Sequence, residues 1–212
     1  WQVGTPQGHV GVWDASKARI TVTSGSAFAI SILDKYVRIE GLQIQYDDNA
    51  ASGDGIYIGD IGSNTGEIRI ENNLIKTRTS GATPYNGISV STPRTGVTLK
   101  VFNNIIYDCA NYGFVDASNL ASAGTTYFYE NTIYDCATGL AATGAAPRTV
   151  HAKNNIVQNA GTAAYAGSLN AASTNNLSND ATAPGANART NKTGGTAVTF
   201  LDAGNDDFRL SP

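Results

Sequence analysis

The sequence predicts an all-β fold, a right-handed single-stranded parallel β-helix (solenoid) of about six to seven coils with an asparagine ladder. Three observations support this. A short apolar phrase recurs along the chain, apolar residues alternate with period two inside it, and no amphipathic helix is present. Aligned phrases are 31, 31, 27, 24 and 21 residues apart, which is typical of solenoids. The aligned residues are Leu42, Asn73, Asn104, Asn131, Asn155 and Asn176.

The first part of the chain is expected to start the solenoid. Residues 1–17 are irregular and are expected to cap the first coil, because an uncovered coil end would be an open sheet edge. Apolar and polar residues then alternate at 19–22 and 27–32, which predicts the strands of an opening coil.

Each later coil is expected to hold two or three short strands. The recurring phrase supplies the first, and an apolar stretch at or near a glycine supplies the next. Parallel strands lie about 4.8 Å apart, so equivalent residues of neighbouring coils are stacked. The apolar stretches are 55–58, 87–90, 113–115, 139–141 and 163–165.

Two stacks follow from this register. An aliphatic stack is expected inside the solenoid, formed by Ile44, Ile75, Ile106, Ile133 and Val157. An asparagine ladder is expected at a turn, because each side-chain amide can donate to one neighbouring coil and accept from the other. The ladder residues are Asn73, Asn104, Asn131, Asn155 and Asn176.

The repeat fades after Asn176. Residues 178–196 are rich in Ala, Thr, Asn, Gly and Pro and are expected to form a long surface loop, followed by closing strands at 197–201 and 207–210. The chain is therefore predicted to be a single β-helix domain, 1–212. It would consist of a cap at 1–17, coils at 18–177, and a C-terminal loop with closing strands at 178–212.

Composition narrows the partners and the location. The net charge is −3 and basic residues are scattered, so nucleic acid is not an expected partner. No apolar run approaches the ~20 residues that span a bilayer. The chain begins at Trp1 and contains no Met, so we expect a removed leader or a fragment. A removed leader fits an extracellular or cell-surface protein.

Several segments resemble a known superfamily. They are VRIEGLQI (37–44), IRIENNLI (68–75), VFNNIIYDC (101–109), AKNNIVQN (152–159) and the tail that ends in DFRLSP. They resemble right-handed parallel β-helix repeat proteins of the pectate-lyase-like superfamily, in particular bacterial and metagenomic surface-type members, over roughly 18–210. The superfamily includes lyases, hydrolases, epimerases, phage tailspikes and adhesins, so the resemblance implies a fold and not one activity.

The resemblance suggests one set of catalytic candidates. A polysaccharide lyase of this superfamily would bind calcium through Asp or Glu and use an Arg or Lys as base. Asp47, Asp48 and Asp54 are the best candidates for calcium ligands, and Arg78 follows one coil later. Calcium takes six to eight oxygen ligands. The motifs that mark such lyases are absent, and a solvated acidic turn explains the same residues.

A second set comes from the repeat itself. Asp108 and Asp135 occupy equivalent positions on neighbouring coils, about 5 Å apart at Cα, where each carboxylate would raise the pKa of the other. A glycosidase needs two such carboxylates, although duplication of the phrase Ile-Tyr-Asp-Cys also explains the pair.

Cys109 and Cys136 follow in the same register. Their spacing allows a disulfide, and the alternative is a pair of buried, reduced thiols.

Aromatic residues suggest a binding surface. Tyr107 and Tyr134 share one position that is expected to face outward, and Tyr127 and Tyr129 lie on another strand. Such a stripe can contact sugar rings, but tyrosine is also common in ordinary strands. The sequence has two histidines, which is too few for a multi-histidine metal site.

Three functions remain open. We expect a non-catalytic extracellular structural or adhesive β-helix without a cofactor, because the known catalytic motifs are absent. Its partner would be another copy of itself, in a homo-oligomer or filament, or a polysaccharide. The alternatives are a calcium-dependent polysaccharide lyase or other carbohydrate-active enzyme, and a glycan-binding or receptor-binding module.

Overall fold

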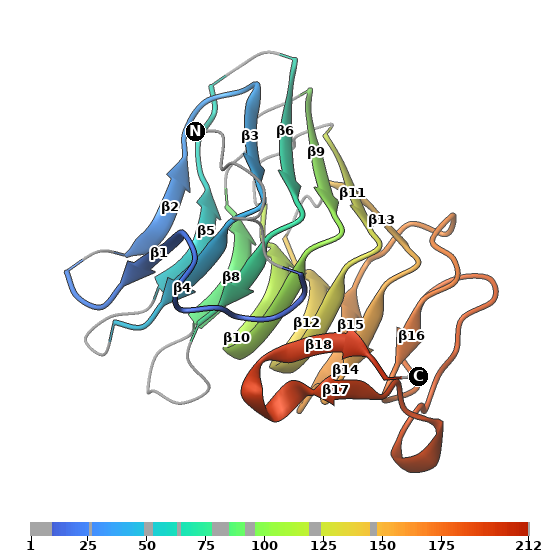
Figure 1. Cartoon of the computed structure of the whole chain (residues 1–212). Coiled ribbons are helices and arrows are strands. Elements are labelled where there is room, and N and C mark those ends of the chain that lie inside the picture. Colours follow the sequence, from blue (N-terminus) through green and yellow to red (C-terminus); the bar gives the residue numbers. More distant parts are fainter. Residues whose placement is uncertain are drawn as a thin grey trace.

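A computed structural model shows an all-β chain wound into a parallel β-solenoid of about five turns (Figure 1). It describes residues 10–25, 27–48, 53–62, 65–77, 85–91, 96–118, 124–144 and 148–211. The predicted fold class is confirmed, but the expected six to seven coils are slightly too many. The first two strands and the segment after Asn176 contribute only partial turns.

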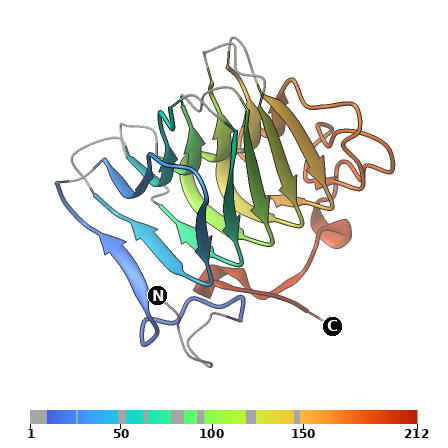
Figure 2. The same ribbon diagram turned by 90° about the horizontal axis from the view of Figure 1, so that it is seen from above.

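The turns build three faces. The first face is a five-stranded parallel sheet, and Figure 2 shows its strands side by side along the solenoid. In chain order its strands are β3 (Val37–Glu40), β6 (Gly66–Glu71), β9 (Val97–Phe102), β11 (Thr125–Tyr129) and β13 (Thr149–Lys153).

The second and third faces form one 11-stranded sheet, because β10 and β12 run continuously through both. The second face holds β1 (Arg19–Val22), β4 (Gln43–Tyr46), β7 (Leu74–Lys76), the starts of β10 (Ile105–Asp116) and β12 (Thr132–Ala142), β14 (Ile156–Gln158) and β16 (Leu177–Ser178). The third face holds β2 (Phe28–Ile32), β5 (Gly53–Ile58), β8 (Tyr85–Val90), the ends of β10 and β12, and β15 (Ala163–Gly167).

The expected aliphatic stack fills the core. Its members pair in register from one coil to the next and are fully buried: Ile44, Ile75, Ile106, Ile133 and Val157. The third-face strands pass close to this stack and need glycine there. A Cβ on Gly87 would lie only 2.3 Å from Cγ2 of Ile106, so a side chain at this position would force the coils apart.

The asparagines after the first face form a continuous hydrogen-bonded ladder. Oδ1 of Asn131 accepts from the backbone N–H of Asn104 at 2.9 Å and from its Nδ2 at 3.0 Å. Nδ2 of Asn131 donates to the carbonyl of Val101 at 2.9 Å. The pattern recurs at Asn73 and Asn155. Each amide therefore satisfies buried backbone groups that the turn leaves without a strand partner.

The segment after β16 differs from the expected surface loop. It continues the last turn through isolated bridges between Thr174 and Ala186 and between Leu177 and Arg189. A short 3-10 helix, η1 (Gly194–Thr196), follows. This segment therefore covers the C-terminal end of the solenoid.

The chain then returns across the outside of the second face (Figure 1). We call this part the C-terminal strap: β17 (Phe200–Asp202), η2 (Ala203–Asn205) and β18 (Asp207–Leu210), an antiparallel pair joined by a turn. The backbone N–H of Phe208 donates to the carbonyl of Gly11 at 2.9 Å, and that of Trp13 donates to Asp206 at 3.1 Å. The strap therefore joins the two ends of the described chain.

One buried cation ties three coils together. Arg148 is 2% exposed. Its Nε donates to Oγ1 of Thr126 at 3.1 Å and lies 3.6 Å from Oδ2 of Asp116. Another guanidinium nitrogen donates to the carbonyls of Val97 and Thr125. Burial raises the pKa of Asp116, while a hydrogen bond from Ser118 and the charge of Arg148 oppose this effect.

Replacing Asn131 with Ala should lower the free energy of unfolding by about 3 kcal/mol, because buried groups on the neighbouring coil lose their partner. Asn103→Gly is the matched control. Asn103 is exposed and has a φ of 53°, which glycine adopts freely, so this change should cost less than about 1 kcal/mol. Chemical denaturation followed by circular dichroism measures both. Equal losses would contradict a special role for the ladder.

Replacing Arg148 with Met should lower the free energy of unfolding by about 3–5 kcal/mol, because Asp116 would stay buried without a counter-charge. The control is Arg209→Met, which removes an ion pair with Asp207 and should change stability little, because exposed ion pairs are screened by solvent. Adding Asp116→Asn to Arg148→Met should restore part of the loss. Failure to restore any would show that the pairing of charges is not the cause.

Candidate functional site: a groove beneath the C-terminal strap

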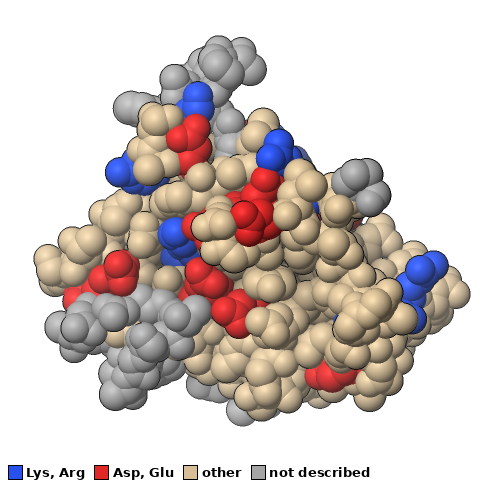
Figure 3. All heavy atoms as spheres, turned by 60° about the horizontal axis from the view of Figure 1, so that its bottom comes forward, with Lys and Arg blue, Asp and Glu red and all other residues tan. Residues whose placement is uncertain are grey.

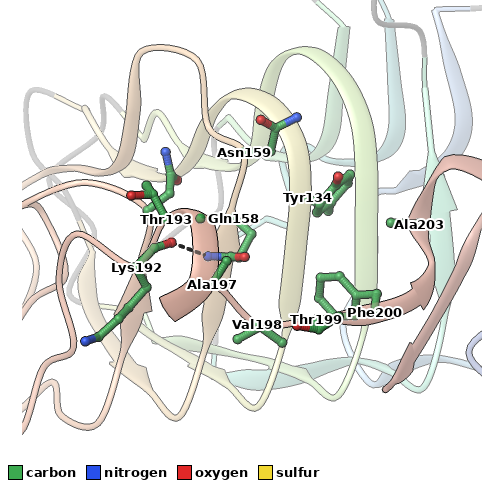
Figure 4. Close-up of a pocket in the computed structure, with 12 residues that line it drawn as sticks. Tyr134, Gln158, Asn159, Lys192, Thr193, Ala197, Val198, Thr199, Phe200 and Ala203 are labelled. Carbon is green, nitrogen blue, oxygen red and sulfur yellow. Dashed lines mark hydrogen bonds between the residues drawn. The ribbon is translucent and has the colours of Figure 1, made fainter. Parts of the chain in front are cut away.

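The strap and the segment before it leave a groove of about 450 Å³ over the outside of β12 and β14 (Figure 4). Amides, hydroxyls, aromatic rings and small apolar groups line it. The lining residues are Tyr134, Gln158, Asn159, Asn179, Lys192, Thr193, Gly194, Ala197, Val198, Thr199, Phe200 and Ala203. The side chain of Lys192 turns away from the other lining groups in Figure 4, so the groove is mainly neutral.

Strand register places the groove's central side chains. Tyr134 and Gln158 are paired on β12 and β14, and both point outward because the residue before each belongs to the aliphatic stack. Nε2 of Gln158 donates to the carbonyl of Lys192 at 2.8 Å, which holds the loop over the strands. The ring of Tyr134 meets that of Phe200 edge-on at 5.7 Å. The hydroxyl of Tyr134 has no hydrogen-bond partner among the described residues.

Asn159 connects the groove with a second hollow. Its Nδ2 donates to Oδ1 of Asp135 at 2.8 Å. The second hollow has a volume of about 270 Å³ and is lined by Cys109, Ala110, Asp135, Cys136, Ala137, Asn159 and Gly161. Asn159 lines both spaces, so they adjoin at this residue.

Asp108 and Asp135 form what we call the acid corner, where the second face turns into the third. Both have positive φ values, 55° and 51°, a conformation that Asp and Asn tolerate better than most residues. Burial, together with the charges of Asp206 and Asp135, raises the pKa of Asp108 to about 6, while the charge of Lys76 opposes this shift. The ammonium of Lys76 lies 2.7 Å from Asp206. The backbone carbonyl of Asp108 accepts a hydrogen bond from Thr77 at 3.3 Å, but its carboxylate has no hydrogen bond or ion pair within the described ranges.

Tyr107 is not the exposed glycan contact that its position predicted. It is fully buried, with its ring centroid 4.6 Å from that of Phe208. It does point away from the solenoid core, but the strap covers it. The covering residues lie about a hundred positions later in the chain, and no periodicity connects the two segments. Tyr134, one coil away, is only partly covered and lines the groove.

Tyr127 and Tyr129 lie on the outside of the first face, away from the groove. Tyr129 stacks on Phe102 at 5.4 Å and Tyr127 stacks on His151 at 5.3 Å, with interplanar angles of 12° and 20°. The ammonium of Lys153 lies 5.5 Å from the Tyr129 ring. Ring faces that would stack on a sugar are therefore engaged by side chains of neighbouring strands.

The residues considered for a calcium-dependent lyase already have protein partners. Oδ2 of Asp48 accepts from the backbone N–H of Gly25 at 2.7 Å, and Asp54 accepts from Asn86 at 2.7 Å and from Ser89. Asp47 adjoins Asp48 at the end of β4, and Arg78 lies outside the described residues. Across the described ranges, no group of three or more His, Cys, Asp or Glu is arranged to hold a metal ion.

Cys109 and Cys136 are paired in register on β10 and β12, and both are buried free thiols. The disulfide considered from the sequence is therefore not formed in the structure. Burial raises the pKa of Cys136 well above its ordinary value, which disfavours the reactive thiolate.

Sequence reasoning missed Gln158, Asn159 and Asn179 as lining residues. A signal existed for the first two, because Gln158-Asn159 aligns with Tyr134-Asp135 on the preceding coil. No comparable signal existed for the segment 192–203, which has no repeat.

No family model matches this chain, and neither the curated proteins nor the solved structures include a significant match. Within the described residues, no helix is long and apolar enough to cross a membrane.

The raised pKa of Asp108 predicts a pH effect on stability. The pKa of the Asp108 carboxyl is about 6 in the folded chain, and its ordinary value is 3.8. The folded state therefore favours the protonated carboxyl. Its contribution to stability is fully present below pH 3.8 and is lost as the pH rises through 6. Asp108→Asn should therefore raise the melting temperature at pH 7.5 by about 2–4 °C, after discounting for partial exposure.

At pH 3.5 the same substitution should leave the melting temperature unchanged. Asp34→Asn, at an exposed turn, is the control and should change neither value. A loss of stability at pH 7.5 in Asp108→Asn would contradict the unfavourable environment of this carboxylate.

Proposed function

We propose that this protein is a non-catalytic, glycan-binding β-solenoid of the adhesive type, located outside the cell or on its surface. The observation that supports this most is the convergence of Tyr134, Gln158 and Asn159 in one groove of about 450 Å³. This volume falls within the range of small-ligand sites.

The chemistry of the groove suits a polyol. A sugar hydroxyl both donates and accepts hydrogen bonds, and so do the amides of Gln158, Asn159 and Asn179 and the hydroxyls of Thr193 and Thr199. Aromatic rings next to polar groups supply apolar contact for the C–H faces of a sugar. A nucleotide or another strongly anionic ligand would find little complementary charge, since the one basic lining side chain turns away.

The other functions have weaker support. A lyase would need Asp48 and Asp54 to exchange protein hydrogen bonds for metal. Head-to-tail filaments would need a strand edge at the C-terminal end, where the structure has isolated bridges instead. Membership of the pectate-lyase-like superfamily is part of the proposal and rests on the repeated phrases and the three-faced solenoid.

Filling the groove tests this proposal. Ala197→Trp should reduce affinity for a bound oligosaccharide at least tenfold, because the larger side chain occupies the ligand's space, while the far-ultraviolet circular dichroism spectrum stays unchanged. The probes are neutral cello-, xylo-, manno- and chito-hexasaccharides, measured by glycan array and then by isothermal titration calorimetry.

The matched control is Tyr127→Ala on the first face, which should bind as the unmodified protein does. If Tyr127→Ala abolished binding and Ala197→Trp did not, the stacked tyrosines and not the groove would be the site. Absence of binding to every neutral probe and to a glucosamine hexamer would contradict a glycan-binding function for the groove.

A further inference from the structure

The acid corner carries more negative charge than the protein neutralises. Asp108 and Asp135 lie side by side on neighbouring coils, because the residues before and after them are paired in register on β10 and β12. Burial raises the pKa of Asp108, and the charges of Asp206 and Asp135 contribute to the same shift. One lysine, Lys76, pairs with Asp206. Asp135 accepts a hydrogen bond from a neutral amide, and Asp108 has no such partner in the part of the chain that the structure describes. In the view of Figure 3, acidic atoms gather near the centre of the molecule's surface, beside a basic group.

A second observation indicates that this corner is incompletely satisfied. Tyr107 is fully buried, and its hydroxyl has no hydrogen-bond partner within hydrogen-bonding distance among the described residues. Burial raises the pKa of this hydroxyl, and the nearby charges of Asp206 and Asp108 raise it further. A buried polar group without a partner is unfavourable. Here it adjoins Asp206, which is paired with Lys76, and Asp108, whose carboxylate has no ion pair among the described residues. A positive group that enters the corner would supply counter-charge to Asp108.

The corner is continuous with the groove. Asn159 lines the groove and donates to Asp135. Tyr134 also lines the groove. Burial raises the pKa of its hydroxyl, and the charges of Asp135 and Asp108 raise it further. A ligand in the groove can therefore place one substituent beside these carboxylates while the rest of it contacts the neutral amides.

We propose that the glycan bound in the groove carries free amino groups, and that one sugar ammonium sits at the acid corner between Asp108 and Asp135. This inference rests on the proposed function and specifies its ligand class. The ammonium supplies three hydrogen-bond donors and one positive charge. These suit the two carboxylates, which together accept one hydrogen bond from the described residues, the bond from Asn159 to Asp135.

Other ligands fit the corner less well. A uronate polymer would bring like charge to three carboxylates, which is destabilising. A divalent metal ion lacks a suitable group of ligands among the described residues. A fully N-acetylated glycan is neutral, so it would leave the carboxylate of Asp108 without a counter-charge.

The test compares two oligosaccharides by calorimetry near pH 6: a glucosamine hexamer, whose amino groups are free, and an N-acetylglucosamine hexamer, whose amino groups are acetylated and uncharged. The free amino groups of the glucosamine hexamer are charged at this pH. The charged hexamer should bind about tenfold more tightly, and this preference should shrink as salt rises from about 0.05 M to 0.5 M.

Two variants separate this inference from the proposed function. In Asp108→Asn/Asp135→Asn the affinities for the two hexamers should become about equal, since the amides keep the shape of the corner and lose its charge. Asp34→Asn is the matched control for net charge and should keep the tenfold preference.

The outcomes are distinct. Equal binding of both hexamers by the unmodified protein would overturn the inference and leave glycan binding in the groove supported. Binding of neither hexamer would overturn the inference, and the neutral panel described above would then decide the proposed function alone. A preference that survives in the double variant would place the ammonium elsewhere and would also overturn it.

Discussion

The asparagine ladder fixes the register in which successive coils stack, and the rest of the molecule depends on that register. Asn73, Asn104, Asn131, Asn155 and Asn176 are almost fully buried at one turn, and each joins the backbone of one coil to the side chain of the next. A slip by one residue would expose the aliphatic stack and bury polar groups, because side chains alternate between the two sides of a strand. The ladder therefore determines which residues line the core and which face outward into the groove.

The strap contributes the second structural constraint. Phe208 covers Tyr107, and the backbone of β18 pairs with residues near Gly11 and Trp13. These contacts link segments that are far apart in the chain, in contrast to the coil-to-coil contacts of the solenoid. The strap also turns an exposed sheet face into a groove, because it stands beside Tyr134 without covering it completely. The groove therefore lies where the repeat ends.

A buried charge inside the solenoid and a half-buried charge on its outer surface differ in the partners that the protein provides. Arg148 is fully buried but has carbonyl, hydroxyl and carboxylate partners, so its charge is compensated within the fold. Asp108 is only half-buried, and its carboxylate has no such partners among the described residues. An uncompensated charge costs stability in the unbound protein. Its presence beside a groove is consistent with a site that is completed by a ligand.

The sequence by itself determined the all-β solenoid, the aliphatic stack and the stacking of Asp108 on Asp135, because each depends on a short repeat whose spacing is set by the distance between parallel strands. It also identified Tyr134, but not Gln158 and Asn159 beside it. Only the tertiary structure decided which outward-facing residues stay accessible. Tyr107 and Tyr134 have the same place in the repeat, yet one is sealed under Phe208 and the other lines a groove. That difference depends on where the non-repeating segment 192–210 packs, and no local pattern encodes the packing of a segment without a repeat.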